Sequence, residues 1–177
     1  MKQIYYQFAN KVSFLADDYF CSDGGIRVFP ALYHQISQRQ NYFIPWLINK
    51  TLIEKYTESL DFVSNSANEI LRSSFSGFYL LPNAWKLRVI ESINLFDMVR
   101  RAQRFLCLNV PYEIWETTRE SVAEIISVHP DVKKLFVPPC TIRNDEGIKM
   151  PCPYTDNYCG IQTWRNDVCC FDRSTTY

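Results

Sequence analysis

Apolar side chains recur at three- and four-residue steps through most of residues 1–136, which is the spacing of one face of an α-helix. The clearest run covers residues 53–70, where charged side chains fall on the other faces. Its apolar positions are Ile53, Tyr56, Leu60, Val63, Ala67 and Ile70. This seam is typical of a helix that packs along its length in a bundle. It therefore predicts a long amphipathic helix whose apolar face serves internal packing.

Two further runs of the same period predict helices before and after this one. The first has apolar positions at Ile4, Phe8, Val12, Leu15 and Tyr19, and the consecutive glycines of residues 22–25 suit a turn that ends it. The second begins after Asn83, whose side chain is suited to capping a helix. It continues through Trp85, Val89, Ile93, Phe96 and Val99 to about Cys107. Residues 76–82 predict a linker or, at most, a short strand.

Beyond the break at residues 109–111, the pattern predicts a helix from Tyr112 to Val128 and a short one after Pro130. Short connections make neighbouring helices antiparallel, so an up-and-down order is the simplest topology. We therefore expect a mainly α fold, with an irregular antiparallel helical bundle over residues 1–136.

Residues 137–177 show no helical period, and prolines at 138, 139, 151 and 153 interrupt any helix. We expect a loop-rich, cysteine-bearing extension here. Ordering such a segment costs about 1–2 kcal/mol per residue, which must be offset by burial on the bundle, cross-links or another subunit. Aromatic residues are favoured at interface centres, so four of them are candidates for docking: Tyr154, Tyr158, Trp164 and Phe171. Folding back onto the bundle is the alternative.

Composition excludes several classes of protein. The chain has 177 residues, 47% of them apolar and 21% charged, which is a globular balance. Its 19 basic and 19 acidic side chains give no net charge, which disfavours a nucleic-acid partner. The N-terminal residues lack the apolar core of a secretory signal, and no apolar run approaches the ~20 residues that span a bilayer. We therefore expect synthesis in the cytoplasm and no membrane partner.

Seven cysteines are present, and five of them fall in the extension: Cys140, Cys152, Cys159, Cys169 and Cys170. They are candidates for a disulfide or thiol cluster, since a particle released into an oxidising medium could acquire such bonds. Zinc is disfavoured because no pair shows the short spacing of a zinc knuckle, and both histidines lie outside the extension. We predict no metal and no cofactor. Cys21 and Cys107 are expected to be buried small apolar residues.

Charged residues cluster near the predicted helix hairpin. Arg100, Arg101 and Arg104 form a candidate interaction patch, and four glutamates follow at positions 113, 116, 120 and 124. The two sets could face one another, or the arginines could contact phosphate or an acidic partner. With five glycines the chain has no glycine-rich phosphate loop, and it has no recognised catalytic motif. We predict no catalytic residue.

These observations favour a non-enzymatic structural or adaptor subunit of a larger protein assembly, such as a virus-like particle. Its extension and aromatic surface would dock on other protein subunits. The alternative is a small regulatory binding protein that uses its arginine patch against an acidic or nucleic-acid-bound target. An enzyme that uses a thiol is the third hypothesis, and it would require a cysteine with a lowered pKa and a histidine base.

Overall fold

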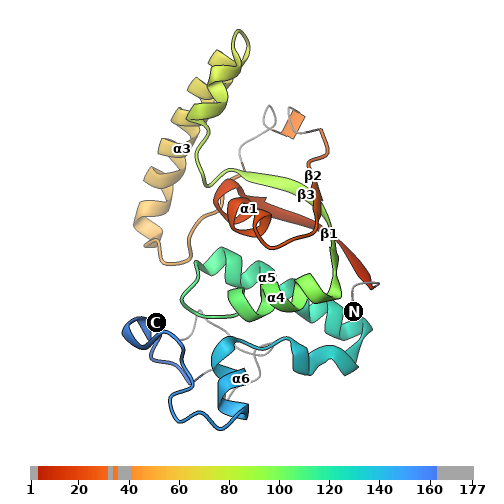
Figure 1. Cartoon of the computed structure of the whole chain (residues 1–177). Helices are drawn as coiled ribbons and strands as arrows, with labels where there is room; N and C mark the ends of the chain where they lie inside the picture. Colours follow the sequence, from red (N-terminus) through yellow and green to blue (C-terminus); the bar gives the residue numbers. More distant parts are fainter. Residues whose placement is uncertain (1–3, 32–33, 36–40, 163–177) are drawn as a thin grey trace. The chain divides into compact units, whose positions relative to one another are not determined.

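The computed structural model describes residues 4–31, 34–35 and 41–162 (Figure 1). Its elements, in chain order, are strand β1 (Tyr5–Ser13), helix α1 (Phe14–Cys21), strand β2 (Ile26–Val28), helix α3 (Lys50–Leu71), 3₁₀ helix η1 (Phe75–Leu80), strand β3 (Lys86–Asn94), helix α4 (Leu95–Phe105), helix α5 (Tyr112–Val128), 3₁₀ helix η2 (Pro130–Leu135), helix α6 (Pro139–Asp145) and 3₁₀ helix η3 (Thr155–Asn157). Within these residues, no helix is both long and apolar enough to cross a membrane.

The chain divides into two compact units. One contains residues 8–22 and 26–91, and the other contains residues 1–7, 23–25 and 92–177. Strands β1 and β3 each begin in one unit and end in the other.

The prediction of an all-helical bundle over residues 1–136 is wrong, because the fold contains a three-stranded antiparallel sheet in the order β1-β3-β2. Main-chain hydrogen bonds close the β1–β3 pair at each end. The Phe14 amide donates to the Trp85 carbonyl at 3.0 Å, and the Leu95 amide donates to the Ile4 carbonyl at 2.9 Å. The chain is therefore a mixture of helix and sheet.

Strand β3 shows why the helical prediction failed. Val89 and Ile93 are four residues apart, a separation that places two side chains on the same face of either a helix or a strand. The buried positions of β3 are Leu87, Val89, Glu91 and Ile93, alternate residues that follow the two-residue period of a strand. In β1 the buried Phe8 and Val12 have the same ambiguous separation.

Both strands run directly into a helix at a polar capping residue. The Ser13 hydroxyl accepts a hydrogen bond from the Ala16 amide at 3.1 Å, and the Asn94 side chain accepts one from the Asp97 amide at 2.9 Å. These bonds satisfy early helical amides and start α1 and α4 where the strands end. Asn83, predicted as a cap, instead precedes a strand, and its carbonyl accepts from the Leu15 amide at 3.2 Å.

The helices predicted at 53–70 and 112–128 are confirmed as α3 and α5. Two local predictions are wrong. Residues 75–80 form η1 rather than a linker, and Pro139 opens α6 instead of preventing a helix. Proline is tolerated at the first helical position because its missing amide would have no partner there, and its fixed φ suits the helix.

A buried ion cluster holds β2 against its neighbours. The Arg27 guanidinium donates to Glu91 on β3 at 2.9 Å and to Asp17 on α1, and it lies 5.6 Å from the centre of the Phe20 ring. The side chains of Arg27 and Glu91 are 7% and 1% exposed. Charges removed from water to this extent are tolerated only when they are paired. The cluster therefore fixes this edge of the sheet.

Replacing Arg27 by Met should lower the free energy of unfolding by about 3–5 kcal/mol, because Glu91 is left as an unpaired buried charge. Urea unfolding measures the loss. The exposed Arg72 provides the control, and Arg72→Met should change stability by less than about 0.5 kcal/mol. Arg27→Met combined with Glu91→Leu should recover part of the loss. Equal stability of the two arginine variants would contradict the role given to Arg27.

Candidate functional site

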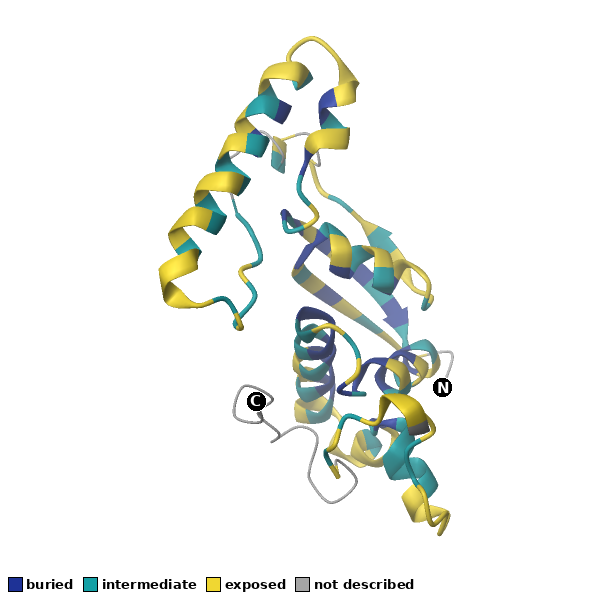
Figure 2. Cartoon of the chain, turned by 90° about the vertical axis from the view of Figure 1, so that its left-hand side faces the viewer, coloured by how far each residue is buried: buried dark blue, intermediate teal, exposed yellow. Residues whose placement is uncertain are grey.

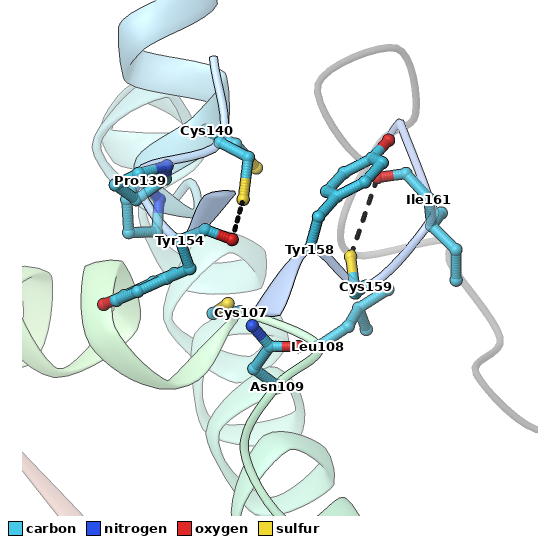
Figure 3. Close-up of a pocket in the computed structure, with 11 residues that line it drawn as sticks. Cys107, Leu108, Asn109, Pro139, Cys140, Tyr154, Tyr158, Cys159 and Ile161 are labelled. Atoms are coloured by element: carbon cyan, nitrogen blue, oxygen red, sulfur yellow. Dashed lines mark hydrogen bonds between the residues drawn. The ribbon is translucent and has the colours of Figure 1, made fainter. Parts of the chain in front are cut away.

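Four cysteines line one small cavity in the unit that contains α4, α5 and α6 (Figure 3). Cys107 lies in the connection from α4 to α5, Cys140 lies in the first turn of α6, and Cys152 and Cys159 lie in the irregular chain on either side of η3. The cavity has a volume of about 10 Å³, close to the space that one water molecule needs. Its other lining residues are Leu108, Asn109, Pro139, Pro153, Tyr154, Tyr158 and Ile161. No acidic, basic or histidine side chain is among them.

Three of the four sulfurs bond to the main chain two residues ahead. The Asn109 amide donates to the Cys107 sulfur. The Cys152 thiol donates to the Tyr154 carbonyl at 3.6 Å, and the Cys159 thiol donates to the Ile161 carbonyl at 3.7 Å. Each of these cysteines is thus held by a local turn that orients its sulfur relative to the cavity.

Two contacts between segments hold the surrounding loops. The Asn109 side-chain amide donates to the Asn157 carbonyl, which joins the α4–α5 connection to η3. The Arg143 guanidinium donates through Nε to the Pro151 carbonyl at 2.9 Å, which joins α6 to the chain before Cys152. These bonds bring cysteines that are far apart in sequence to one place.

The cavity favours the protonated form of the Cys107 thiol. Burial raises the pKa of the Cys107 thiol, the Asn109 amide lowers it, and the proximity of Cys159, Cys140 and Cys152 raises it further. A nucleophilic cysteine requires the opposite, a lowered pKa beside a cation or a histidine. Across the described ranges, no three cysteine, histidine, aspartate or glutamate side chains already stand in a geometry that could hold a metal ion.

The structure brings together only part of the cysteine cluster expected in the extension. Cys140, Cys152 and Cys159 share the cavity, whereas Cys169 and Cys170 lie outside the described residues. Two of the proposed docking aromatics, Tyr154 and Tyr158, line the cavity and remain partly exposed. The other two, Trp164 and Phe171, also lie outside the described residues.

Sequence reasoning missed Cys107, which is half-buried at the cavity rather than part of a helix core. Helix α4 ends at Phe105, so Cys107 belongs to a connection. The interruption of the helical pattern at Asn109–Pro111 was the one indication in the sequence. It places Cys107 beside a turn, where its sulfur can face another segment.

The three arginines of the predicted interaction patch do not share one exposed surface. Arg101 is buried and donates to the Gly24 carbonyl at 3.4 Å, and Arg104 pairs with Asp23 at 3.0 Å. Asp23 and Gly24 belong to the glycine turn that follows α1. Arg100 is exposed and, unlike the other two arginines, has no hydrogen bond to this turn. Gly24 has φ of +84°, a value that a residue with a side chain adopts only with strain. Arg101 and Arg104 thus bind α4 to the glycine turn.

Arg101→Met should lower the free energy of unfolding by about 1–3 kcal/mol, because it removes a buried charged donor from the turn. Arg100→Met is the matched control and should change stability by less than about 0.5 kcal/mol. Urea unfolding of both variants checks the difference. If the Arg100 variant loses as much stability as the Arg101 variant, the distinction between the two arginines fails.

Cys21 is exposed, so its prediction as a buried residue is wrong. Its surroundings still do not activate it. Partial burial raises the pKa of the thiol, and the Asp17 carboxylate, which accepts a hydrogen bond from it, raises the pKa further. A raised pKa leaves less thiolate, the reactive form, near neutral pH.

Alkylation of Cys21 at pH 8 should therefore be slower in the folded protein than in the urea-unfolded chain, and the difference should shrink as the pH rises through the folded-state pKa. Peptide mass spectrometry after timed labelling measures both rates. Faster alkylation of Cys21 in the folded protein would contradict this account and would support the hypothesis of a thiol enzyme.

The sequence matches no known protein family, and no protein of characterised function is similar to it. What can be inferred about function therefore rests on the residues of this chain itself.

Proposed function

We propose that the protein is a non-enzymatic structural or adaptor subunit that docks on a second copy of its own chain. The docking surface is the α3–η1 face, defined by the exposed apolar side chains Leu52, Phe62, Ile70, Phe75, Tyr79 and Leu80. Three of them are almost fully open to solvent: Phe62 is 74% exposed, Phe75 is 79% exposed and Tyr79 is 92% exposed. Aromatic residues exposed in this way are typical of surfaces that bind protein.

The observation that carries the proposal is the incomplete burial of α3. The helix has 22 residues, yet only Ser64 and Ala67 are buried. Four positions of the apolar seam, Ile53, Tyr56, Leu60 and Val63, are only half-buried, and Ile70 is exposed. Leu52 and Phe62 are exposed beside the seam, and Figure 2 shows how little of the long helix is buried. Apolar side chains left open in this way are covered when a second surface packs on them.

The face is held in place by its own unit. Packing of η1 on α3 is so close that a side chain at Gly77 would come within 2.5 Å of the Ala67 carbonyl. The Tyr42 hydroxyl lies 3.2 Å from the Leu60 carbonyl and 2.8 Å from the Ser64 hydroxyl. Docking on a surface that is already ordered loses less conformational entropy, so more of the contact energy appears as affinity.

A second copy is the partner that the charges favour. The chain has 19 basic and 19 acidic side chains, so two copies have no net repulsion to overcome. Helix α3 itself carries both signs, for example Lys50, Lys55 and Glu58. A two-fold interface uses the same face twice, and a face of mixed sign can satisfy its own charges there.

The triple variant Phe62→Ser, Phe75→Ser and Tyr79→Ser should weaken self-association by at least about tenfold, since truncation of an interface anchor commonly costs more than 1.4 kcal/mol. Sedimentation velocity over a range of concentrations measures the dissociation constant. Stability to urea should stay unchanged within about 1 kcal/mol, because the three side chains contribute little to the core of the isolated chain.

Val128 is the matched control, since it is also exposed, apolar and helical but lies on α5. Val128→Ser should leave the dissociation constant within about twofold of the original. A wild-type chain that stays monomeric up to about 1 mM would overturn docking between copies. Equal effects of the control and the triple variant would overturn the choice of face.

A further inference from the structure

The chain around the four-cysteine cavity contains little that could order it. Helix α6 has 7 residues, none of them buried, and η3 has 3 residues. The remaining chain from Glu146 to Gln162 is irregular and proline-containing. Small loop-rich segments of this kind usually depend on disulfides or on a bound metal for their stability. The cavity lies where such a cross-link would join α6 and the chain around η3 to the end of α4.

We infer that Cys107, Cys140, Cys152 and Cys159 form a structural zinc site. Structural Zn²⁺ takes four ligands in a tetrahedron, and four thiolates are one of its standard ligand sets. The lining residues offer no carboxylate or imidazole, so only a cation that prefers sulfur fits the cavity. This inference concerns a different unit from the α3–η1 face and does not depend on docking there.

Metal binding here requires the sulfurs to close on the ion, since no three of them already stand in coordinating geometry within the described residues. A closed site rarely exists before the metal arrives, because ordering of the loops and binding occur together. The segments that carry Cys152 and Cys159 are irregular chain, so a small rearrangement does not break a helix or strand. Figure 3 shows the labelled Cys107, Cys140 and Cys159 side chains around one central space.

The charge balance of the site can also be satisfied. Each of the four thiols releases its proton to solvent as it binds, so the complex of Zn²⁺ with four thiolates carries two net negative charges. Such charge requires amide donors nearby. The Asn109 amide already donates to the Cys107 sulfur. The Tyr154 and Ile161 carbonyls accept from the Cys152 and Cys159 thiols, so both carbonyls must turn away when these thiols lose their protons.

The lack of a closely spaced cysteine pair within residues 137–177 does not exclude zinc here, because one of the four ligands, Cys107, lies outside those residues. Cys107 is 33 positions before Cys140, and no short knuckle contains it. Sequence spacing is a poor guide when each ligand comes from a separate segment, because the fold rather than a tight turn sets the distances. The separations of the other cysteines along the chain therefore do not exclude this site.

Zinc content of the full chain, purified under reducing conditions, tests the inference. We expect about one Zn²⁺ per chain by elemental analysis, and Co²⁺ added in its place should give the visible absorption of a tetrahedral thiolate complex. Replacing any one of the four cysteines by Ala should weaken Zn²⁺ binding, measured by competition with a chelator, by at least about 10–100-fold.

Cysteines that are not among the four proposed ligands supply the controls. Cys21→Ala, on the exposed end of α1, and the double variant Cys169→Ala with Cys170→Ala should keep about one Zn²⁺ per chain. If a variant of the four does not fold, removal of zinc from the wild-type chain by a chelator provides a second measurement. Proteases should then cut within residues 139–161 while α4 and α5 stay protected.

Three results would overturn the zinc site. The first is a reduced wild-type chain that binds neither Zn²⁺ nor Co²⁺. The second is a freshly purified chain whose mass and peptide map show disulfides among these four cysteines. The third is zinc that is retained by the four single variants but lost from the Cys21 or Cys169/Cys170 controls.

Discussion

The buried guanidinium of Arg27 is the interaction on which the sheet-containing unit depends. Glu91 lies in β3, the middle strand, and its side chain is 1% exposed, so its charge has almost no contact with water. Arg27 supplies the opposite charge from the short edge strand β2 and also reaches Asp17 on α1. One side chain thus links β2, β3 and α1, in addition to the hydrogen bonds by which the 3-residue strand β2 pairs with β3.

The other unit depends on apolar packing and on two further arginine contacts. The buried residues of α4 include Met98, Ala102 and Phe105, and those of α5 include Ile114, Trp115 and Val122. Arg101 and Arg104 attach the glycine turn at residues 23–25 to α4. Phe136, just after η2, also belongs to the core, whereas none of the residues described between 139 and 162 is buried.

Each unit therefore leaves one feature incomplete. In the first, α3 and η1 present apolar side chains that their own packing does not cover. In the second, four thiols surround a cavity within chain that has little regular structure. A protein surface would cover the apolar side chains of α3 and η1, and a cation would bind the four thiols. Both proposals start from side chains that the rest of the chain leaves open to an additional partner, apolar ones on α3 and η1 and thiols around the cavity.

The sequence by itself determined α3 and α5, because a helix longer than four turns repeats its apolar period often enough to exclude a strand. It could not separate strand from helix at β1 and β3, where apolar residues four apart satisfy both periods and a capping residue joins strand to helix without a gap. Only the tertiary structure showed that Cys107 joins Cys140, Cys152 and Cys159, or that Arg101 is buried. Such contacts join segments far apart along the chain, and their distances depend on how whole elements pack rather than on any local pattern.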